Sequence, residues 1–107
     1  MINANELRIG NWVKDSLGYL VIGVNAKVEF ASAYEPIPLT PEILEKCGAI
    51  VYEFDNGEQN QYRIKERLFV IRDGDIVDYG SSVIIKHLHQ LQNLYFALCG
   101  EELNYTP

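Results

Sequence analysis

Cysteine, long apolar runs and positive charge are all scarce in this chain of 107 residues, and each shortage excludes a class of protein. Cys47 and Cys99 form no CxxC pattern, so we expect reduced thiols rather than a disulfide framework. No apolar run approaches the roughly 18 residues of a membrane-spanning helix, and Met1 is not followed by a basic and apolar leader. We therefore expect a cytoplasmic protein with no membrane association. Nine Lys and Arg against 15 Asp and Glu give a net charge of −6, which opposes phosphate neutralisation and makes nucleic acid an unfavourable partner.

The motifs of catalytic and metal sites are missing as well. Residues 80–82 lack the GxSxG pattern of a serine nucleophile, and the acidic hairpin 73–78 lacks the spacing of an EF-hand loop. His87 and His89 are the only histidines. On a strand they would share a face and could chelate a metal, whereas on a helix they would point apart, and no third ligand follows at a recognised spacing. We predict no catalytic residue, no metal ligand and no cofactor. Whether the two histidines do more than support the structure is left open.

Alternating apolar and polar residues predict an antiparallel sheet. Strands are expected at residues 11–14, 19–24, 27–31, 50–55, 62–67, 68–72 and 75–79, and a short apolar run covers residues 83–85. Thr40 as N-cap and Pro41 at the first helical position predict a short helix over residues 40–47. The sequence thus predicts a single α+β domain over residues 1–107, with a mostly antiparallel sheet, a short middle helix and a C-terminal amphipathic helix. The first three strands could form an SH3-like N-terminal half-barrel.

The C-terminal helix, residues 87–99, is the most informative segment. Gly100 ends it, because glycine adopts the left-handed conformation at little cost. Leu91, Leu94 and Leu98 recur at helical spacing and are predicted to be core residues. The polar face is mostly amide and uncharged, a composition that can meet a partner. The predicted partner surface is Gln90, Gln92, Asn93, Tyr95 and Phe96.

A basic stripe of Arg63, Lys65 and Arg67 lies on one face of the strand predicted at residues 62–67. One interpretation is a nucleic-acid or acidic-peptide surface. The other, which we favour, is an ordinary solvated sheet face whose charges are offset by Glu53 and Asp55 across a hairpin. The single tryptophan, Trp12, is predicted to be a core anchor.

Three segments carry a resemblance to a known family. They are NELRIGNWV at residues 5–13, IPLTPEIL at residues 37–44, and HQLQNLYFAL at residues 89–98, followed by GEEL at 100–103. In this order they resemble a family of small uncharacterised proteins of prophages and mobile elements in anaerobic gut bacteria. The chain departs from that pattern at Cys99, where threonine is expected. The resemblance implies a bacterial or phage cytoplasmic origin and brings no activity or catalytic residue with it.

These observations favour a non-catalytic binding or assembly module of phage or mobile-element origin. A protein partner or self-association would use the amide face of the last helix. The alternative is a nucleic-acid accessory protein that uses the basic strand face. An enzyme of unrecognised type ranks last.

Overall fold

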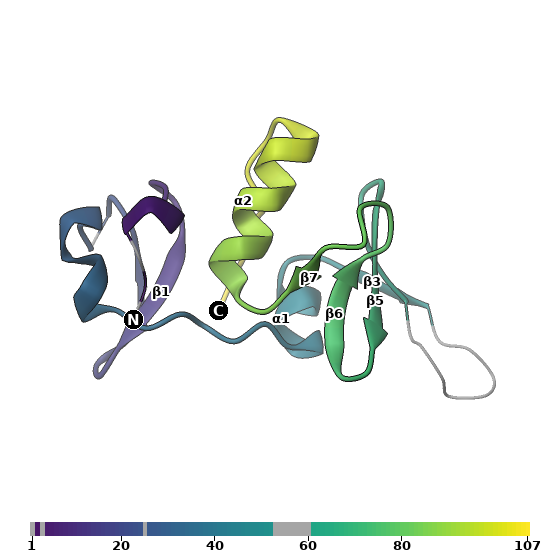
Figure 1. The fold of residues 1–107 in the computed structure, drawn as a ribbon, viewed down its shortest axis with the longest axis horizontal. Coiled ribbons are helices and arrows are strands. Elements are labelled where there is room, and N and C mark those ends of the chain that lie inside the picture. Colours follow the sequence, from purple (N-terminus) through teal and green to yellow (C-terminus); the bar gives the residue numbers. More distant parts are fainter. Residues whose placement is uncertain (1, 3, 25, 53–60) are drawn as a thin grey trace. The chain divides into compact units, whose positions relative to one another are not determined.

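The computed structural model describes residues 2, 4–24, 26–52 and 61–107, and its chain divides into two compact units (Figure 1). Unit 1 comprises Met1–Pro38 and His87–Glu102, and unit 2 comprises Leu39–Lys86 and Leu103–Pro107. Together the elements make an α+β fold with antiparallel sheets, a short middle helix and a C-terminal helix, which confirms the predicted fold class. The expectation of a single domain over residues 1–107 stays a prediction.

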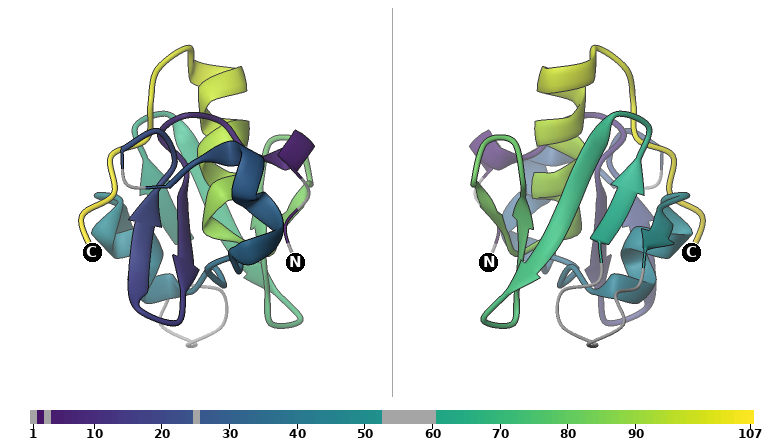
Figure 2. Two further views of the ribbon diagram at one scale, coloured as in Figure 1. Left: turned by 90° about the vertical axis from the view of Figure 1, so that its left-hand side faces the viewer. Right: turned by 90° about the vertical axis from the view of Figure 1, so that its right-hand side faces the viewer.

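Unit 1 contains a two-stranded hairpin, two 3-10 helices and the long helix. Its elements are η1 (Ala4–Glu6), β1 (Trp12–Asp15), β2 (Gly18–Val21), η2 (Val28–Ala33) and α2 (Leu88–Cys99). The antiparallel register pairs Trp12 with Val21 and Asp15 with Gly18, and the two strands lie side by side in the left view of Figure 2. A small buried cluster forms the core of this hairpin region, namely Ile2, Val13, Ile22 and Ala26.

The prediction of a strand at residues 27–31 is wrong, because residues 28–33 form the 3-10 helix η2. The Phe30 N–H donates to the Lys27 carbonyl at 3.0 Å, and the Tyr34 N–H donates to the Ala31 carbonyl at 3.1 Å. These bonds between residues three apart satisfy the backbone locally, as a 3-10 helix does. Ala31 is buried whereas Phe30 points outward, so the alternation expected of a strand is lost. With only β1 and β2 paired, the SH3-like half-barrel is not formed.

Helix α2 begins and ends where the sequence predicts. His87 is the N-cap of a capping box, in which the Gln90 side chain accepts from the His87 N–H at 3.1 Å. Gly100 closes the helix with φ of 73°, and its N–H donates to the Phe96 carbonyl. Leu91 is fully buried and Leu94 is half-buried. Leu98 is 47% exposed, so its prediction as core is wrong. The physical reason is that the last turn is open to solvent, since Phe96, Ala97 and Leu98 are all exposed.

Unit 2 is a five-stranded antiparallel meander with one short helix. The helix α1 spans Pro41–Lys46, and Thr40 caps it by accepting from the Ile43 N–H at 3.2 Å, as predicted. The strands β3 (Ile50–Tyr52), β4 (Gln61–Ile64), β5 (Arg67–Arg72), β6 (Asp75–Asp78) and β7 (Ile84–Ile85) follow one another in sheet order. The hairpin β5–β6 stands out in green in Figure 1. Residues 53–55 of the strand predicted at 50–55 lie outside the described part of the chain.

Candidate functional site

A network of side-chain amides joins the N-terminal segment of unit 1 to helix α2. Gln92 on α2 is buried. Its side chain accepts one hydrogen bond from the backbone at the start of β1 and donates another to it. Its carbonyl Oε1 accepts from the Trp12 N–H at 2.8 Å, and its Nε2 donates to the Gly10 carbonyl at 2.9 Å. One side chain therefore bonds both a backbone donor and a backbone acceptor.

Asn93, the next residue on α2, extends the network. Its Nδ2 donates to the Glu6 carbonyl at 2.7 Å, and its Oδ1 accepts from the buried Asn11 Nδ2 at 2.9 Å. The same Oδ1 also accepts from Arg8 Nε at 3.0 Å. Asn11 in turn accepts from the Arg8 backbone N–H at 2.7 Å. The first and the third of the segments that carry the family resemblance, residues 5–13 and 89–98, thus contact each other directly.

Arg8 is the hub of this network. Its Nη1 lies 2.5 Å from Glu102 Oε1, and its Nη2 donates to the backbone carbonyl of Gln92 at 3.3 Å. Its guanidinium carbon lies 4.3 Å from the centre of the Phe96 ring. A planar guanidinium suits this task, because it can donate along its edge and stack through its face at the same time.

The structure corrects part of the predicted partner surface. Gln92 and Tyr95 are buried, and Asn93 is engaged by the N-terminal segment. The Tyr95 hydroxyl donates to Glu101 at 3.4 Å, and Gln90 caps its own helix. Gln90 and Asn93 are half-buried, and Phe96 is exposed at 41%, with the Arg8 guanidinium over its ring. The three amides of this face therefore bond groups of their own chain.

The two histidines lie at the start of α2 with their rings parallel to each other. The rings of His87 and His89 stack with centroids 5.7 Å apart and an interplanar angle of 6°. His89 is buried, and its Nε2 lies 3.3 Å from Glu6 Oε1. Within the described ranges, no group of three or more His, Cys, Asp or Glu side chains could hold a metal ion.

Arg63, Lys65 and Arg67 do not share one strand face as predicted, because β4 ends at Ile64 and β5 begins at Arg67. Lys65, with φ of 52°, lies in the turn that joins β4 to β5. Strand pairing places Arg63 opposite Leu68 and Arg67 opposite Ile64, so the two arginines lie on opposite faces of the sheet. The expected partners Glu53 and Asp55 lie outside the described residues.

Arg67 instead forms an ion pair with a buried carboxylate in unit 2. Its Nη2 lies 2.5 Å from Oδ2 of the fully buried Asp78. The Ser81 hydroxyl donates to the same oxygen at 2.5 Å, and the Ser81 N–H donates to it at 3.2 Å. This arrangement ties β5 to the turn after β6, where it compensates one buried charge with an opposite charge and two hydrogen bonds.

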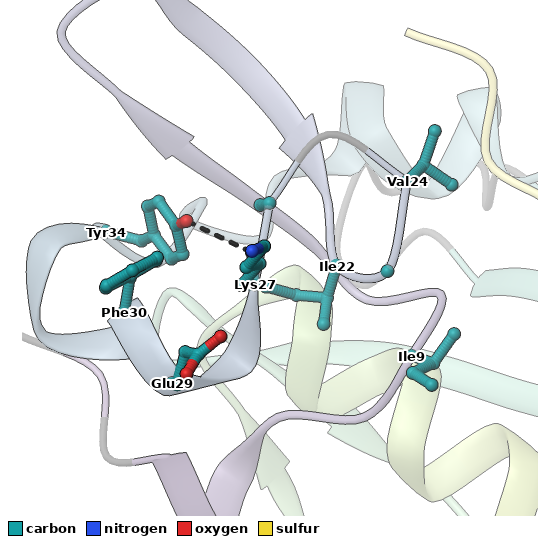
Figure 3. Close-up of a pocket in the computed structure, with 9 residues that line it drawn as sticks. Ile9, Ile22, Val24, Lys27, Glu29, Phe30 and Tyr34 are labelled. Atoms are coloured by element: carbon teal, nitrogen blue, oxygen red, sulfur yellow. Dashed lines mark hydrogen bonds between the residues drawn. The ribbon is translucent and has the colours of Figure 1, made fainter.

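An open apolar hollow of about 630 Å³ lies beside the hairpin of unit 1. Its apolar walls are Ile9, Ile22, Val24, Ala26, Phe30 and Tyr34. Figure 3 places Phe30 and Tyr34 on one side of the hollow and Ile9 and Val24 on the other, with Ile22 between them. Ile9 is 77% exposed, Val24 81% and Phe30 54%, whereas Ile22 is buried. The walls therefore carry apolar surface that the fold itself does not cover.

Backbone hydrogen bonds and one glycine shape this hollow. The Gly10 N–H donates to the Ile22 carbonyl at 2.9 Å, and the Gly23 N–H donates to the Ala26 carbonyl at 2.8 Å. Gly23 has φ of +89°, and a Cβ there would lie 2.7 Å from Cγ2 of Ile9. Glycine is thus required both by the turn and by the approach of Ile9.

Sequence reasoning missed the hollow. Ile9 and Val24 each stand next to a glycine in a turn, where a large apolar residue has no reason to be buried. Phe30 lies in the segment 27–31 that was predicted as a strand and that the structure shows as η2. Apolar residues beside turn glycines were the available signal. Trp12, predicted as a core anchor, is only half-buried.

No helix in the described ranges is long and apolar enough to cross a membrane. Comparison of the chain with protein-family models, curated proteins and solved structures found no match.

Proposed function

We propose that this protein is a non-catalytic binding or assembly module that binds through the apolar hollow of unit 1. One observation carries the proposal: Ile9, Val24 and Phe30 surround a hollow of about 630 Å³ and are each more than half exposed. Clustered apolar surface of this kind is typical of interaction sites, whereas scattered exposed apolar residues are not. The proposed setting, supported by the resemblance of the three segments, is the cytoplasm of a bacterium that carries a prophage or mobile element.

The hollow replaces the amide face of α2 as the proposed contact surface. Gln92 and Asn93 already bond Trp12, Gly10 and Glu6 of the same chain. A partner would have to break those bonds, and leaving the buried groups unpaired is costly. The hollow requires no such exchange, because its apolar walls already face water.

The nucleic-acid alternative has less support than the binding module. A nucleic-acid surface needs several cations on one face. Arg63 and Arg67 lie on opposite faces of their sheet, and Arg67 is engaged by Asp78. The net charge of −6 adds long-range repulsion of phosphate.

The proposal is tested with anilinonaphthalene sulfonate (ANS), a fluorescent probe of apolar surface. We expect saturable binding to the folded protein, and loss of that binding in Phe30→Ser. The matched control is Leu17→Ser, because Leu17 is 93% exposed in the β1–β2 turn and does not line the hollow. Near-ultraviolet circular dichroism must show that each variant keeps its native packing, since partly folded proteins also bind ANS. Equal ANS binding by wild type and Phe30→Ser would contradict the proposal.

A further inference from the structure

Two opposite charges stand together at the wall of the apolar hollow. Lys27 and Glu29 both line it, both are exposed, and they are two positions apart. Neither forms an ion pair with another residue that the structure describes. The surface around the hollow therefore carries a cation and an anion beside its apolar residues, although the whole chain has a net charge of −6.

The exposure of the walls indicates an occupant larger than a small molecule. A hollow of about 630 Å³ has the volume of a ligand pocket. Ile9 and Val24, however, are 77% and 81% exposed, so their side chains project from the surface rather than enclose a space. A small ligand would leave these tips in water, whereas a second protein surface would cover the tips and fill the hollow together.

A surface with a projection, a hollow and one charge of each sign can pair with its own copy, because each feature has a counterpart on the other copy. In a twofold pair the same surface meets its own copy, so residue i contacts residue j and residue j contacts residue i. Most surfaces of a chain with net charge −6 would repel a second copy, but this one places a cation opposite an anion twice. A strongly anionic or cationic partner would gain at one of these charges and lose at the other.

Resting on the proposed function, we infer that the occupant of the hollow is a second copy of this chain. In the twofold pair, Lys27 of each copy faces Glu29 of the other, and the apolar tips of each copy cover the hollow of the other. The hollow has nine lining residues, whereas a stable interface usually has about 20–30 residues a side. The association is therefore weak, and dimers form only at high protein concentration.

Charge reversal tests this arrangement by sedimentation velocity over a range of concentrations. Lys27→Glu places two anions at each contact and Glu29→Lys places two cations, so each variant alone should dimerise about tenfold more weakly or worse. An equimolar mixture of the two variants, and the double variant, should recover dimerisation because opposite charges face each other again. The controls are Lys46→Glu and Glu42→Lys on the exposed face of α1, which alter the net charge equally outside the hollow. They should dimerise like the wild type.

Each outcome decides between the two proposals. Wild-type protein that stays monomeric at all concentrations, but binds ANS in a manner lost in Phe30→Ser, overturns the dimer and leaves the binding module standing. Dimers that tolerate both single reversals also overturn the inference, since the interface then lies elsewhere. A monomer that binds neutral phosphatidylcholine vesicles through Phe30 assigns the hollow to lipid and overturns it too. Loss of ANS binding and of dimerisation together in the wild type removes both proposals.

Discussion

The guanidinium of Arg8 lies 4.3 Å from the centre of the Phe96 ring and joins the N-terminal segment to the last turns of α2. The sequence analysis placed Phe96 on the predicted partner surface. In the structure a cation of its own chain covers the ring, while 41% of the residue stays exposed. A stacked guanidinium of this kind contributes about 0.5–1 kcal/mol at a partly exposed site.

Replacing Arg8 should weaken unit 1 well beyond the loss of this stacking. Arg8→Ala removes the bonds to Asn93, Glu102 and the Gln92 carbonyl, so we expect the free energy of unfolding to fall by about 2 kcal/mol. Arg8→Lys keeps the charge but not the planar fork, and should recover less than half of that loss. Urea denaturation followed by the fluorescence of Trp12, the only tryptophan, measures both. Equal stability of the wild type and Arg8→Ala would show that the network is not stabilising.

Gln92 should be the amide that the fold tolerates losing least. Gln92→Leu leaves the Trp12 N–H and the Gly10 carbonyl without their partner, at a cost of about 2–4 kcal/mol. The control is Gln90→Glu on the same helix, because a carboxylate still accepts from the His87 N–H near the helix start. Thermal unfolding should show a large drop for Gln92→Leu and almost none for the control. A near-neutral Gln92→Leu would return this face of α2 to the candidate partner surfaces.

Local signals of the sequence predicted the helices well. Thr40, Pro41 and Gly100 act within one turn of their own position, so capping rules apply to them without knowledge of the rest of the fold. The role of the α2 amides could not be predicted in this way. Their partners Gly10 and Trp12 are about 80 residues away in sequence, and uncharged amides look the same whether they meet water, a partner or their own backbone.

The errors in the sheet have a different physical origin. The turn between β4 and β5 places Lys65 at φ of 52°, and no Gly, Asn or Pro marks it in the sequence. Without that turn, Arg63 and Arg67 seemed to share a strand face. The strand predicted at residues 27–31 failed because local 3-10 bonds satisfied its backbone, which alternation of side chains does not reveal.

Leu91 and Leu98 occupy the same predicted stripe but should behave differently. Leu91 is fully buried, and Leu91→Ala should cost about 2–5 kcal/mol because it leaves a cavity. Leu98 is 47% exposed, and Leu98→Ala should cost less than about 1 kcal/mol. Thermal melts of the two variants, measured side by side, give the comparison. Similar losses for both would mean that the last turn of α2 is covered in solution.

Burial raises the pKa of the Cys47 thiol from its ordinary 9.0 to about 12, so the protein should lose stability in alkaline solution. Below pH 9.0 the thiol is protonated in both states and contributes its full share. Above that pH the unfolded chain releases the proton while the folded chain holds it until about pH 12, so unfolding becomes more favourable.

Cys47→Ala should be less stable at neutral pH because it removes a buried sulfur, yet its stability should decline less steeply between pH 9 and 12. Urea denaturation at a series of alkaline pH values measures the two slopes. Parallel slopes would show that Cys47 is not the group responsible.

The most direct test of the account is amide chemical-shift mapping of the isotope-labelled protein during an ANS titration. The binding-module proposal predicts that the perturbed amides cluster around the hollow, at Ile9, Gly23, Val24 and Phe30. The side-chain amides of Gln92 and Asn93 should keep their shifts, because they remain bonded inside unit 1. Perturbations centred instead on Phe96 and Leu98, with the hollow unchanged, would contradict the proposal and place the binding surface on α2.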